Sequence, residues 1–399
     1  MVNEPRQYFN DSFSVEKYQA MLAEIENEFP STLEFRVAES PIFVSKELKI
    51  KILSACGSII DEIKKEGFKE KTERAIPSEH FVPNENQRPD CLAIDFAITK
   101  NADGEFEPQL IELQGFPSLF AYQSYLSSKY KKHFNVQKGY SEFFNRLNTM
   151  TYMQEMQQFF LNGSHPKNTI LLEVFPEKQK TRLDFALTKK FWGIEPVCVT
   201  RLRKSGEDLY YEQDGKKINV ERIYNRLIFD DLDRNYPDLK LNVDLKEPHS
   251  AKWISHPNWF YRVSKFSLPF FKSKYIPESN YLSEFDKAPA DLGNYVLKPL
   301  FSFAGAGVKI DVTKEDLDNI KDPENYLLQR KIAYEPCIKD LNGDGIKCEI
   351  RMLYIWPENA SNPKLITNLA RLSRGKMIGV DYNKNFDWVG GSSAFFETN

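Results

Sequence analysis

The chain has 399 residues, of which 41% are hydrophobic and 28% are charged, and its formal net charge is -3. This composition predicts a globular protein with a substantial core and two or three structural units. It gives no basic surplus for a nucleic-acid backbone, and no apolar run is long enough to cross a bilayer, so we expect neither nucleic acid nor a membrane as a partner.

The start of the chain and the cysteines both favour a cytoplasmic protein. Residues 1–18, MVNEPRQYFNDSFSVEKY, contain acidic residues and no long apolar core, which argues against a signal peptide. The cysteines are odd in number and form no C-x-x-C pair, so we expect reduced thiols in the core. They are Cys56, Cys91, Cys198, Cys337 and Cys348.

The first part of the chain predicts helices, then a hairpin, then further helices. ELKIKILSACGSIIDEIKKEG (47–67) has apolar residues at helical spacing and ends in glycine. CLAIDFAIT (91–99) and PQLIELQG (108–115) have the composition of strands, and the Asp-Gly pair at 103–104 between them favours a hairpin. Residues 124–163 are expected to be helical again.

The middle of the chain predicts a small α/β unit. NTILLEVF (168–175), EPVCVTRL (195–202) and VERIYNRLIF (220–229) have strand composition, the last after a hairpin that carries two lysines. TRLDFALTKKFWG (181–193) is predicted to be a helix closed by glycine. Because no G-x-G-x-x-G turn follows the first strand, a dinucleotide site is not expected there.

The remainder, from about Trp253, alternates strand-like runs with predicted helices. Several of the runs are long enough for an antiparallel sheet. They are YVLKPL (295–300), GVKI (307–310), NYLLQRKI (325–332), KCEIRMLYIW (347–356) and KLITNLARLS (364–373).

A lysine and two glycines form a candidate phosphate site. In YVLKPLFSFAGAGVKI (295–310), Lys298 lies on a strand just ahead of a turn that contains Gly305 and Gly307. Glycines let backbone N–H groups approach a phosphate, and the lysine supplies a positive charge. The pattern predicts a cradle for the triphosphate of ATP. The alternative is a hairpin whose glycines serve only the turn, with Lys298 extending to solvent.

Polar residues on the following strands could complete this site. Gln329 and Arg330 end an apolar strand ahead of a proline-bearing connection suited to the edge of an adenine. Glu349 and Arg351 share one face of a strand, because side chains alternate along a strand. Further candidates are Arg371 and Arg374, which could instead be a charge pair at a sheet edge, and Gly390 with Gly391, which predict a second close backbone approach.

This order of residues resembles the ATP-grasp superfamily of carboxylate-amine ligases. In that family a strand lysine with a glycine loop is followed by a hinge strand, an acidic-x-Arg strand, a second arginine strand and a glycine pair. Lys265, in HPNWFYRVSKFSLPFF, resembles an earlier nucleotide-binding lysine of the family, and the alternative is a surface lysine. The family then ends with an aspartate strand and the metal-binding motif E-x-N-x-x-P, and this sequence stops before them.

A pair of predicted strands near the start of the chain carries residues that resemble the family's missing metal-binding carboxylates. Asp95 lies on one predicted strand, and Glu112 and Gln114 share a face of its neighbour in IELQGFPS, which is similar to E-x-N-x-x-P with glutamine for asparagine. Carboxylates on adjacent strands can hold Mg²⁺ together with ATP phosphates. This arrangement resembles the circularly permuted ATP-grasp proteins, the group that includes glutathionylspermidine synthetase. Ala93 departs from that synthetase, which has arginine there; Arg88 could replace it from the preceding loop, or be a solvated loop residue.

The resemblance implies an α/β (α+β) protein with a circularly permuted ATP-grasp fold. Residues 1–164 would form helices plus the metal-binding hairpin, 165–252 a Rossmann-like unit that precedes the ATP-grasp part and ends in IYNR (223–226), and 253–399 the nucleotide-binding region. It implies a ligase that joins a small-molecule carboxylate to an amine, or to a thiol, through an acylphosphate, with ATP and Mg as cofactors. Nucleotide binding would fall to Lys298, Lys265, Gly305, Gly307 and Gln329, metal binding to Asp95, Glu112 and Gln114, and catalysis to Arg351 and Arg371.

Two other functions stay open. Gln114 and Ala93 would permit an ATP-binding protein that has lost turnover, and the same fold could phosphorylate a small molecule without ligation. Two metal signals are set aside. DLNGDG, from Asp340, begins like a calcium loop, but Arg351 stands where a bidentate glutamate is needed, so a hairpin turn is expected. The five histidines show no zinc-ligand spacing.

Overall fold

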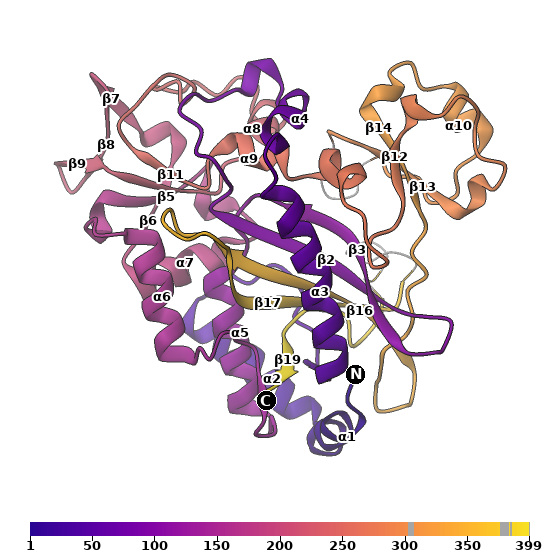
Figure 1. The fold of residues 1–399 in the computed structure, drawn as a ribbon. Coiled ribbons are helices and arrows are strands. Elements are labelled where there is room, and N and C mark those ends of the chain that lie inside the picture. Colours follow the sequence, from indigo (N-terminus) through magenta and orange to yellow (C-terminus); the bar gives the residue numbers. More distant parts are fainter. Residues whose placement is uncertain (302–306, 376–382, 384, 399) are drawn as a thin grey trace.

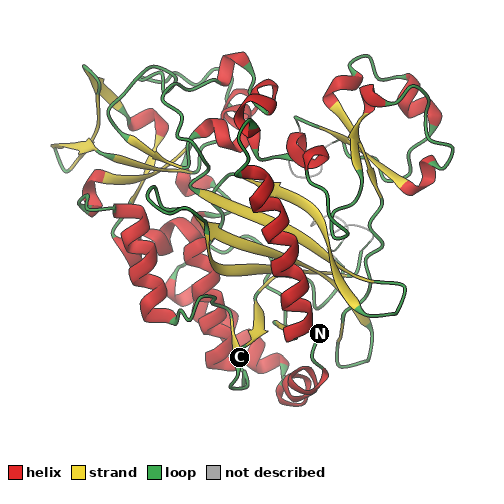
Figure 2. Ribbon diagram, viewed as in Figure 1, coloured by secondary structure: helices red, strands yellow, loops and turns green. Residues whose placement is uncertain are grey.

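The computed structural model describes residues 1–301, 307–375, 383 and 385–398, and within them the chain has a mixed α/β fold with five β-sheets. Figures 1 and 2 show a central sheet with helices packed against it and two smaller sheet-containing lobes beside it. The expectation of an α/β protein is confirmed at this level. Among the helices of the described residues, none combines the length and the apolar composition that a bilayer span requires.

The central sheet joins strands from the two ends of the sequence. Its order is β18-β17-β16-β2-β3, with all pairs antiparallel and β15 paired to β16 outside this path. The hairpin around Asp103-Gly104 is confirmed, with Gly104 at φ +81° in its turn. The strands are β2 (Cys91–Lys100), β3 (Phe106–Gln114), β15 (Ile338–Lys339), β16 (Gly345–Ile355), β17 (Lys364–Ser373) and β18 (Gly390–Ser392).

Helices cover the central sheet because their apolar residues recur at helical spacing. α3 (Lys46–Ile63) buries Leu48, Ile52 and Ile59 and crosses the sheet in Figure 1. Ser45 caps its N-terminus, because the Ser45 hydroxyl accepts a hydrogen bond from the Leu48 N–H. The predicted helix there is confirmed. The other helices are α1 (Asn3–Ser12), α2 (Val15–Glu28), α4 (Phe68–Lys71), α5 (Phe120–His133), α6 (Thr149–Leu161), α7 (Arg182–Trp192), α8 (Phe229–Asn235), α9 (Pro257–Arg262) and α10 (Lys314–Asp318).

The middle of the chain forms a four-stranded parallel sheet with its own apolar core. Its order is β11-β10-β5-β6, and α7 follows β5 and ends at Gly193 with φ +69°. The strands and the helix predicted between residues 168 and 229 are confirmed, although the strands are shorter than expected. They are β5 (Thr169–Glu173), β6 (Glu195–Cys198), β10 (Arg222–Asn225) and β11 (Lys252–Ile254), and the hairpin is built from β7 (Arg203–Ser205), β8 (Asp208–Gln213) and β9 (Lys216–Val220).

A third sheet carries the candidate phosphate lysine. β12 (Ser279–Tyr281), β14 (Tyr326–Arg330) and β13 (Tyr295–Pro299) are antiparallel, and Figure 1 shows them in a lobe beside the central sheet. The expectation of a strand at 307–310 is wrong. Only Lys309 makes a bridge, to Leu297, because the chain turns at Gly307 with φ +71° and continues without further pairing.

The first and last strands of the structure pair with each other. β1 (Ile42–Val44) is parallel to β19 (Ala394–Glu397), and β4 (Tyr140–Ser141) flanks β19 on its other side. Next to them, Gly391 donates its N–H to the Arg36 carbonyl, and a Cβ on Gly390 would lie 2.4 Å from that oxygen. The close approach expected at this glycine pair is therefore to the backbone of Arg36 within the protein.

Candidate functional site

The structure brings the early acidic residues beside the late basic residues. Across the central sheet, Asp95 on β2 is opposite Glu112 on β3 and Arg351 on β16, and Arg371 on β17 is opposite Glu349 on β16. Residues with equal register on neighbouring strands place their side chains on one face of the sheet. The candidate catalytic residues and the acids Asp95 and Glu112 therefore lie on one face of the sheet, in two neighbouring rows: Glu112, Asp95 and Arg351 in one, and Glu349 and Arg371 in the next.

Asp95 is held by both candidate catalytic arginines. Its side chain is buried, with 1% of the residue exposed. Arg351 Nε and Nη2 lie 2.6 Å from the two carboxylate oxygens, and Arg371 Nη2 lies 2.7 Å from Asp95 Oδ2. Such a bidentate guanidinium pair fixes the orientation of both groups. Both oxygens of Asp95, expected to coordinate a metal, are thus engaged by guanidinium groups.

Arg371 also bridges to a second buried carboxylate. Its Nη2 lies 2.8 Å from Glu349 Oε2, and the Tyr334 hydroxyl donates to the other oxygen of Glu349. The pKa of Glu349 is raised by its burial, and Arg371 and Tyr334 offset only part of this rise. The Arg371 guanidinium therefore lies between two buried carboxylates, Asp95 and Glu349, and links them.

Two lysines from outside the central sheet reach the same place, Lys298 from β13 and Lys265 from the 3-10 helix Lys265–Phe270. Lys298 Nζ donates to Gln329 Oε1 at 2.6 Å and to the Ile111 carbonyl at 3.3 Å, so it touches the strand that carries Glu112. Burial lowers the pKa of Lys298 to about 8, although Glu112 opposes this. Lys265 donates to the Pro299 carbonyl at 3.2 Å, and burial lowers its pKa as well. Partly buried ammonium groups that lie close together suit an anionic ligand.

Glu112 and Gln114 line a small cavity at this junction. Gln114 Nε2 donates to Glu112 Oε1 at 2.6 Å, and Lys265, Leu300 and Phe301 line the same cavity, whose volume is about 40 Å³. The described residues contain no group of three or more histidine, cysteine, aspartate or glutamate side chains arranged to hold a metal ion. Glu112 acts on the charge of both lysines, and Asp230 is a second carboxylate in the lining of the cavity.

Only part of the predicted glycine loop can be placed. Gly305 lies outside the described residues. Gly307 has φ +71°, and a Cβ there would lie 2.9 Å from Pro299 Cγ, so its turn against β13 requires glycine. The position of this turn next to β13 fits both a phosphate-binding loop and a simple hairpin turn.

The chain was then compared with known proteins. No family model matches it, and no curated protein matches its sequence. Among solved structures, it is similar to a glutathione synthetase-like effector from Globodera pallida in the apo form, with a TM-score of 0.61, 11% identity, and 98% of this chain and 99% of that chain covered. The chain has a glutathione synthetase-like fold. At this identity the likeness concerns the fold and not the chemistry.

Within the glutathione synthetase-like fold, candidate residues contact three residues that the sequence did not single out: Ser279, Ser118 and Pro117. Gln329, expected to contact the nucleotide, accepts a hydrogen bond from Lys298 and donates to Ser279 Oγ at 3.0 Å, and it is 1% exposed. Arg351 Nη1 lies 3.2 Å from Ser118 Oγ, and Arg226 donates to the Pro117 carbonyl. The segment that follows Gln114 is thus tied to both neighbouring sheets, and the arginine of IYNR was the sequence signal that could have revealed this.

Three other predicted features lie away from the site. Arg374 forms an ion pair with Asp340, which fits the alternative that it is a charged residue at the edge of the sheet. Among the described residues, it makes no ion pair with the acids that bind Arg371. The DLNGDG segment is a turn between β15 and β16, with Asp340 accepting from the Asn342 and Asp344 N–H groups. Arg88 lies over the Trp356 ring, 5.3 Å from its centroid, so it does not replace the arginine missing at Ala93.

Gly115 holds the candidate metal strand against its neighbour. A Cβ there would lie 2.4 Å from the Trp259 carbonyl oxygen and 3.0 Å from Val263 Cβ. We expect Gly115→Ala to lower the free energy of unfolding by about 1–3 kcal/mol, measured by urea denaturation, because backbone must move to admit the methyl group. Gly57→Ala is the control: it lies inside α3 with nothing within 4 Å, and we expect it to be stabilising by about 0.5–1 kcal/mol. Equal effects of the two substitutions would contradict this account.

Proposed function

We propose that the protein is an ATP-dependent ligase that joins a small-molecule carboxylate to an amine, or to a thiol, through an acylphosphate. The observation that carries the proposal is the junction of two sheets at which Lys298 and Lys265 meet Glu112, next to the arginine pair held by Asp95. The glutathione synthetase-like fold supports it, since the fold brings these residues together from distant parts of the chain.

The residues present fit a magnesium nucleotide at this junction. Mg²⁺ takes one or two carboxylates and completes its shell with phosphate oxygens and water. Glu112 would supply the carboxylate, and Gln114 its amide oxygen once the amide turns about its terminal bond. Lys298 and Lys265, with the backbone around Gly305 and Gly307, would hold the phosphates. A bound magnesium nucleotide would supply the phosphoryl group and neutralise part of its charge. Asp95 enters this proposal as the anchor of the arginines.

The two arginines would stabilise the reacting carboxylate. In the proposed reaction a substrate carboxylate oxygen would attack the γ-phosphorus of ATP and ADP would leave; an amine would then attack the acyl carbon and lose one proton to solvent, and inorganic phosphate would leave with the C–O bond electrons. Arg351 and Arg371 are already oriented by Asp95 and Glu349, so they would face the developing negative charge without reorganisation. Gln329 would position the Lys298 ammonium through its 2.6 Å hydrogen bond.

Entry of a nucleotide requires the lobe with β12, β13 and β14 to separate from the central sheet. The cavity between Glu112 and Lys265 has a volume of about 40 Å³, far below the roughly 300–1,000 Å³ of ligand pockets. Both lysines donate to backbone carbonyls here, Lys265 at 3.2 Å and Lys298 at 3.3 Å. Phosphate oxygens would replace these carbonyls as stronger, charged acceptors.

Binding of Mg·ATP is the first test. We expect ATP with Mg²⁺ to raise the melting temperature, and ADP release to require both an acid and an amine from a screening panel. Glu112→Gln should remove the dependence of binding on Mg²⁺, because it removes the carboxylate that would hold the ion beside the lysines. Glu107→Gln is the matched control on the same strand. Absence of a thermal shift with every nucleotide tested would end the proposal.

A second function has a specific observation in its favour. Asp95 is wholly engaged by arginines and the metal motif carries glutamine at position 114, so an ATP-binding protein without turnover is the alternative. Mg·ATP binding without ADP release for any acid and amine pair would support it. ADP release with a hydroxyl acceptor alone would support a small-molecule kinase.

A further inference from the structure

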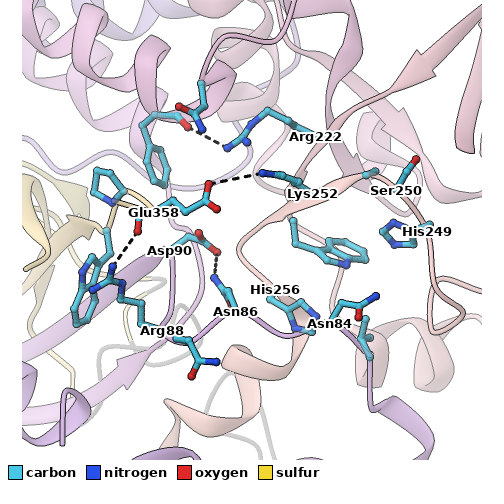
Figure 3. A pocket seen from close by; sticks show the side chains of 18 of the residues that line it. Asn84, Asn86, Arg88, Asp90, Arg222, His249, Ser250, Lys252, His256 and Glu358 are labelled. Carbon is cyan, nitrogen blue, oxygen red and sulfur yellow. Dashed lines mark hydrogen bonds and ion pairs between the residues drawn. The ribbon is translucent and has the colours of Figure 1, made fainter. Parts of the chain in front are cut away.

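A cavity of about 730 Å³ lies apart from the proposed ligase site. Figure 3 shows its walls, which come from the loop at 82–90, the end of α6, the start of β10, residues 247–256 and the turn between β16 and β17. Arg222 is the first residue of β10, whereas Arg226 follows its last residue and contacts the segment after Gln114. At about 3.3 Å per residue, these two ends of the strand are roughly 13 Å apart. The cavity and the ligase site therefore lie at opposite ends of the parallel strands.

Most charged groups around this cavity already have partners. Glu155 Oε2 lies 2.7 Å from Lys364 Nζ, Glu247 Oε2 lies 2.9 Å from Lys204 Nζ, and Lys252 Nζ lies 3.9 Å from Glu358 Oε2. Arg88 donates to the Glu358 carbonyl at 2.9 Å and stacks over the Trp356 ring. The Nε2 of His256 lies 3.1 Å from the Pro83 carbonyl. These contacts build the wall of the cavity.

Asp90 and Arg222 face the cavity as two opposite charges without an ion-pair partner in the described part of the chain. Asn86 Nδ2 donates to Asp90 Oδ2 at 3.0 Å, and Arg222 Nε donates to the Phe160 carbonyl at 2.8 Å. Burial raises the pKa of Asp90 to about 7 and lowers that of Arg222, and each partly offsets the other's shift across the cavity. Two such groups that do not meet leave both charges poorly compensated.

The remaining lining supplies apolar surface and further hydrogen-bonding groups. Trp253, Trp356 and Phe159 form aromatic walls. The His249 ring lines the cavity and lies 5.4 Å from the ring of Trp253. A neutral imidazole offers one donor and one acceptor. The cavity thus combines a carboxylate, a guanidinium, an imidazole and aromatic surface.

We propose that this cavity binds a zwitterionic amino acid or dipeptide with an apolar side chain. Its ammonium group would pair with Asp90, its carboxylate with Arg222, and its side chain would pack against Trp253. A zwitterion satisfies both separated charges at once, which neither a simple anion nor a simple cation can do. The proposal does not depend on ligase activity, and its test needs no nucleotide.

The test is calorimetric titration of the whole protein without ATP. The probes are L-leucine, L-phenylalanine, L-tryptophan and their glycyl dipeptides. We expect at least one of them to bind. We also expect its amide, which lacks the carboxylate, and its N-acetyl derivative, which lacks the ammonium group, to bind at least about tenfold more weakly. Arg222→Gln and Asp90→Asn should each weaken binding of the intact probe by a similar factor. Arg203→Gln, at an exposed strand end of the same unit, should not change it.

Three results would overturn the proposal. None of the six probes binds at millimolar concentration to the folded protein, or the amide and N-acetyl analogues bind as tightly as the zwitterion, or both variants fold and bind the probe with unchanged affinity. The comparison of analogues uses the unmodified protein, so it stays decisive even if a variant fails to fold.

Discussion

Replacing Asp95 by alanine is expected to lower the free energy of unfolding by about 3–5 kcal/mol, measured by urea denaturation. The carboxylate is 1% exposed and bonds Arg351 at 2.6 Å and Arg371 at 2.7 Å. Among the described residues, Asp95 is the carboxylate that pairs with Arg351, and without it Arg371 would keep its pair with Glu349. Removal of one member of a buried ion cluster costs more than the cluster itself contributes, because the remaining charges stay buried.

Two further variants separate this effect from simple loss of a side chain. Asp103→Ala removes a carboxylate from the exposed turn of the same hairpin, and we expect a change within about 0.5 kcal/mol. Asp95→Ala combined with Arg351→Met removes one orphaned cation together with the acid, and we expect it to recover part of the lost stability. If the double variant is as unstable as the sum of both single variants, Asp95 and Arg351 do not act as a pair.

The affinity for Mg·ATP is expected to fall as the pH rises from about 7 to about 9. Burial lowers the pKa of Lys298 to about 8, so its ammonium group, which would attract the phosphates, loses its proton in this interval. Lys298→Met should weaken binding at neutral pH by at least about tenfold and abolish this pH dependence. Lys321→Met, an exposed lysine of the same lobe, should leave both unchanged. A pH profile that is the same with and without Lys298 would contradict the assignment.

The same lysine should affect stability with the opposite sign. Its pKa in the folded protein lies below the ordinary value of 10.5, so the unfolded chain binds the additional proton between about 8 and 10.5. Stability rises with pH wherever the unfolded state binds more protons. Lys298 therefore favours the folded state as the pH increases through this window, while nucleotide affinity decreases, and the two effects can be measured separately.

The sequence predicted most of the strands, and which residues share a face of a strand, because both depend on local signals. Alternation placed Glu349 and Arg351 on one face, and the Asp-Gly turn fixed the β2–β3 hairpin. The sequence could not predict that Asp95 forms an ion pair with Arg351, since the two residues are 256 positions apart. It also missed the pairing of Asp340 with Arg374 and the cavity around Asp90, whose walls come from five separate segments.

The position of β2 beside β16 has a consequence for biogenesis. As the chain leaves the ribosome, the β2–β3 hairpin emerges about 230 residues before its partner strand, so an almost wholly buried strand presents an open edge during most of translation. Closing so long a loop is slow and leaves time for intermolecular pairing. We therefore expect nascent chains of this protein to need chaperones, and slow synthesis at low temperature to favour its recovery in native form.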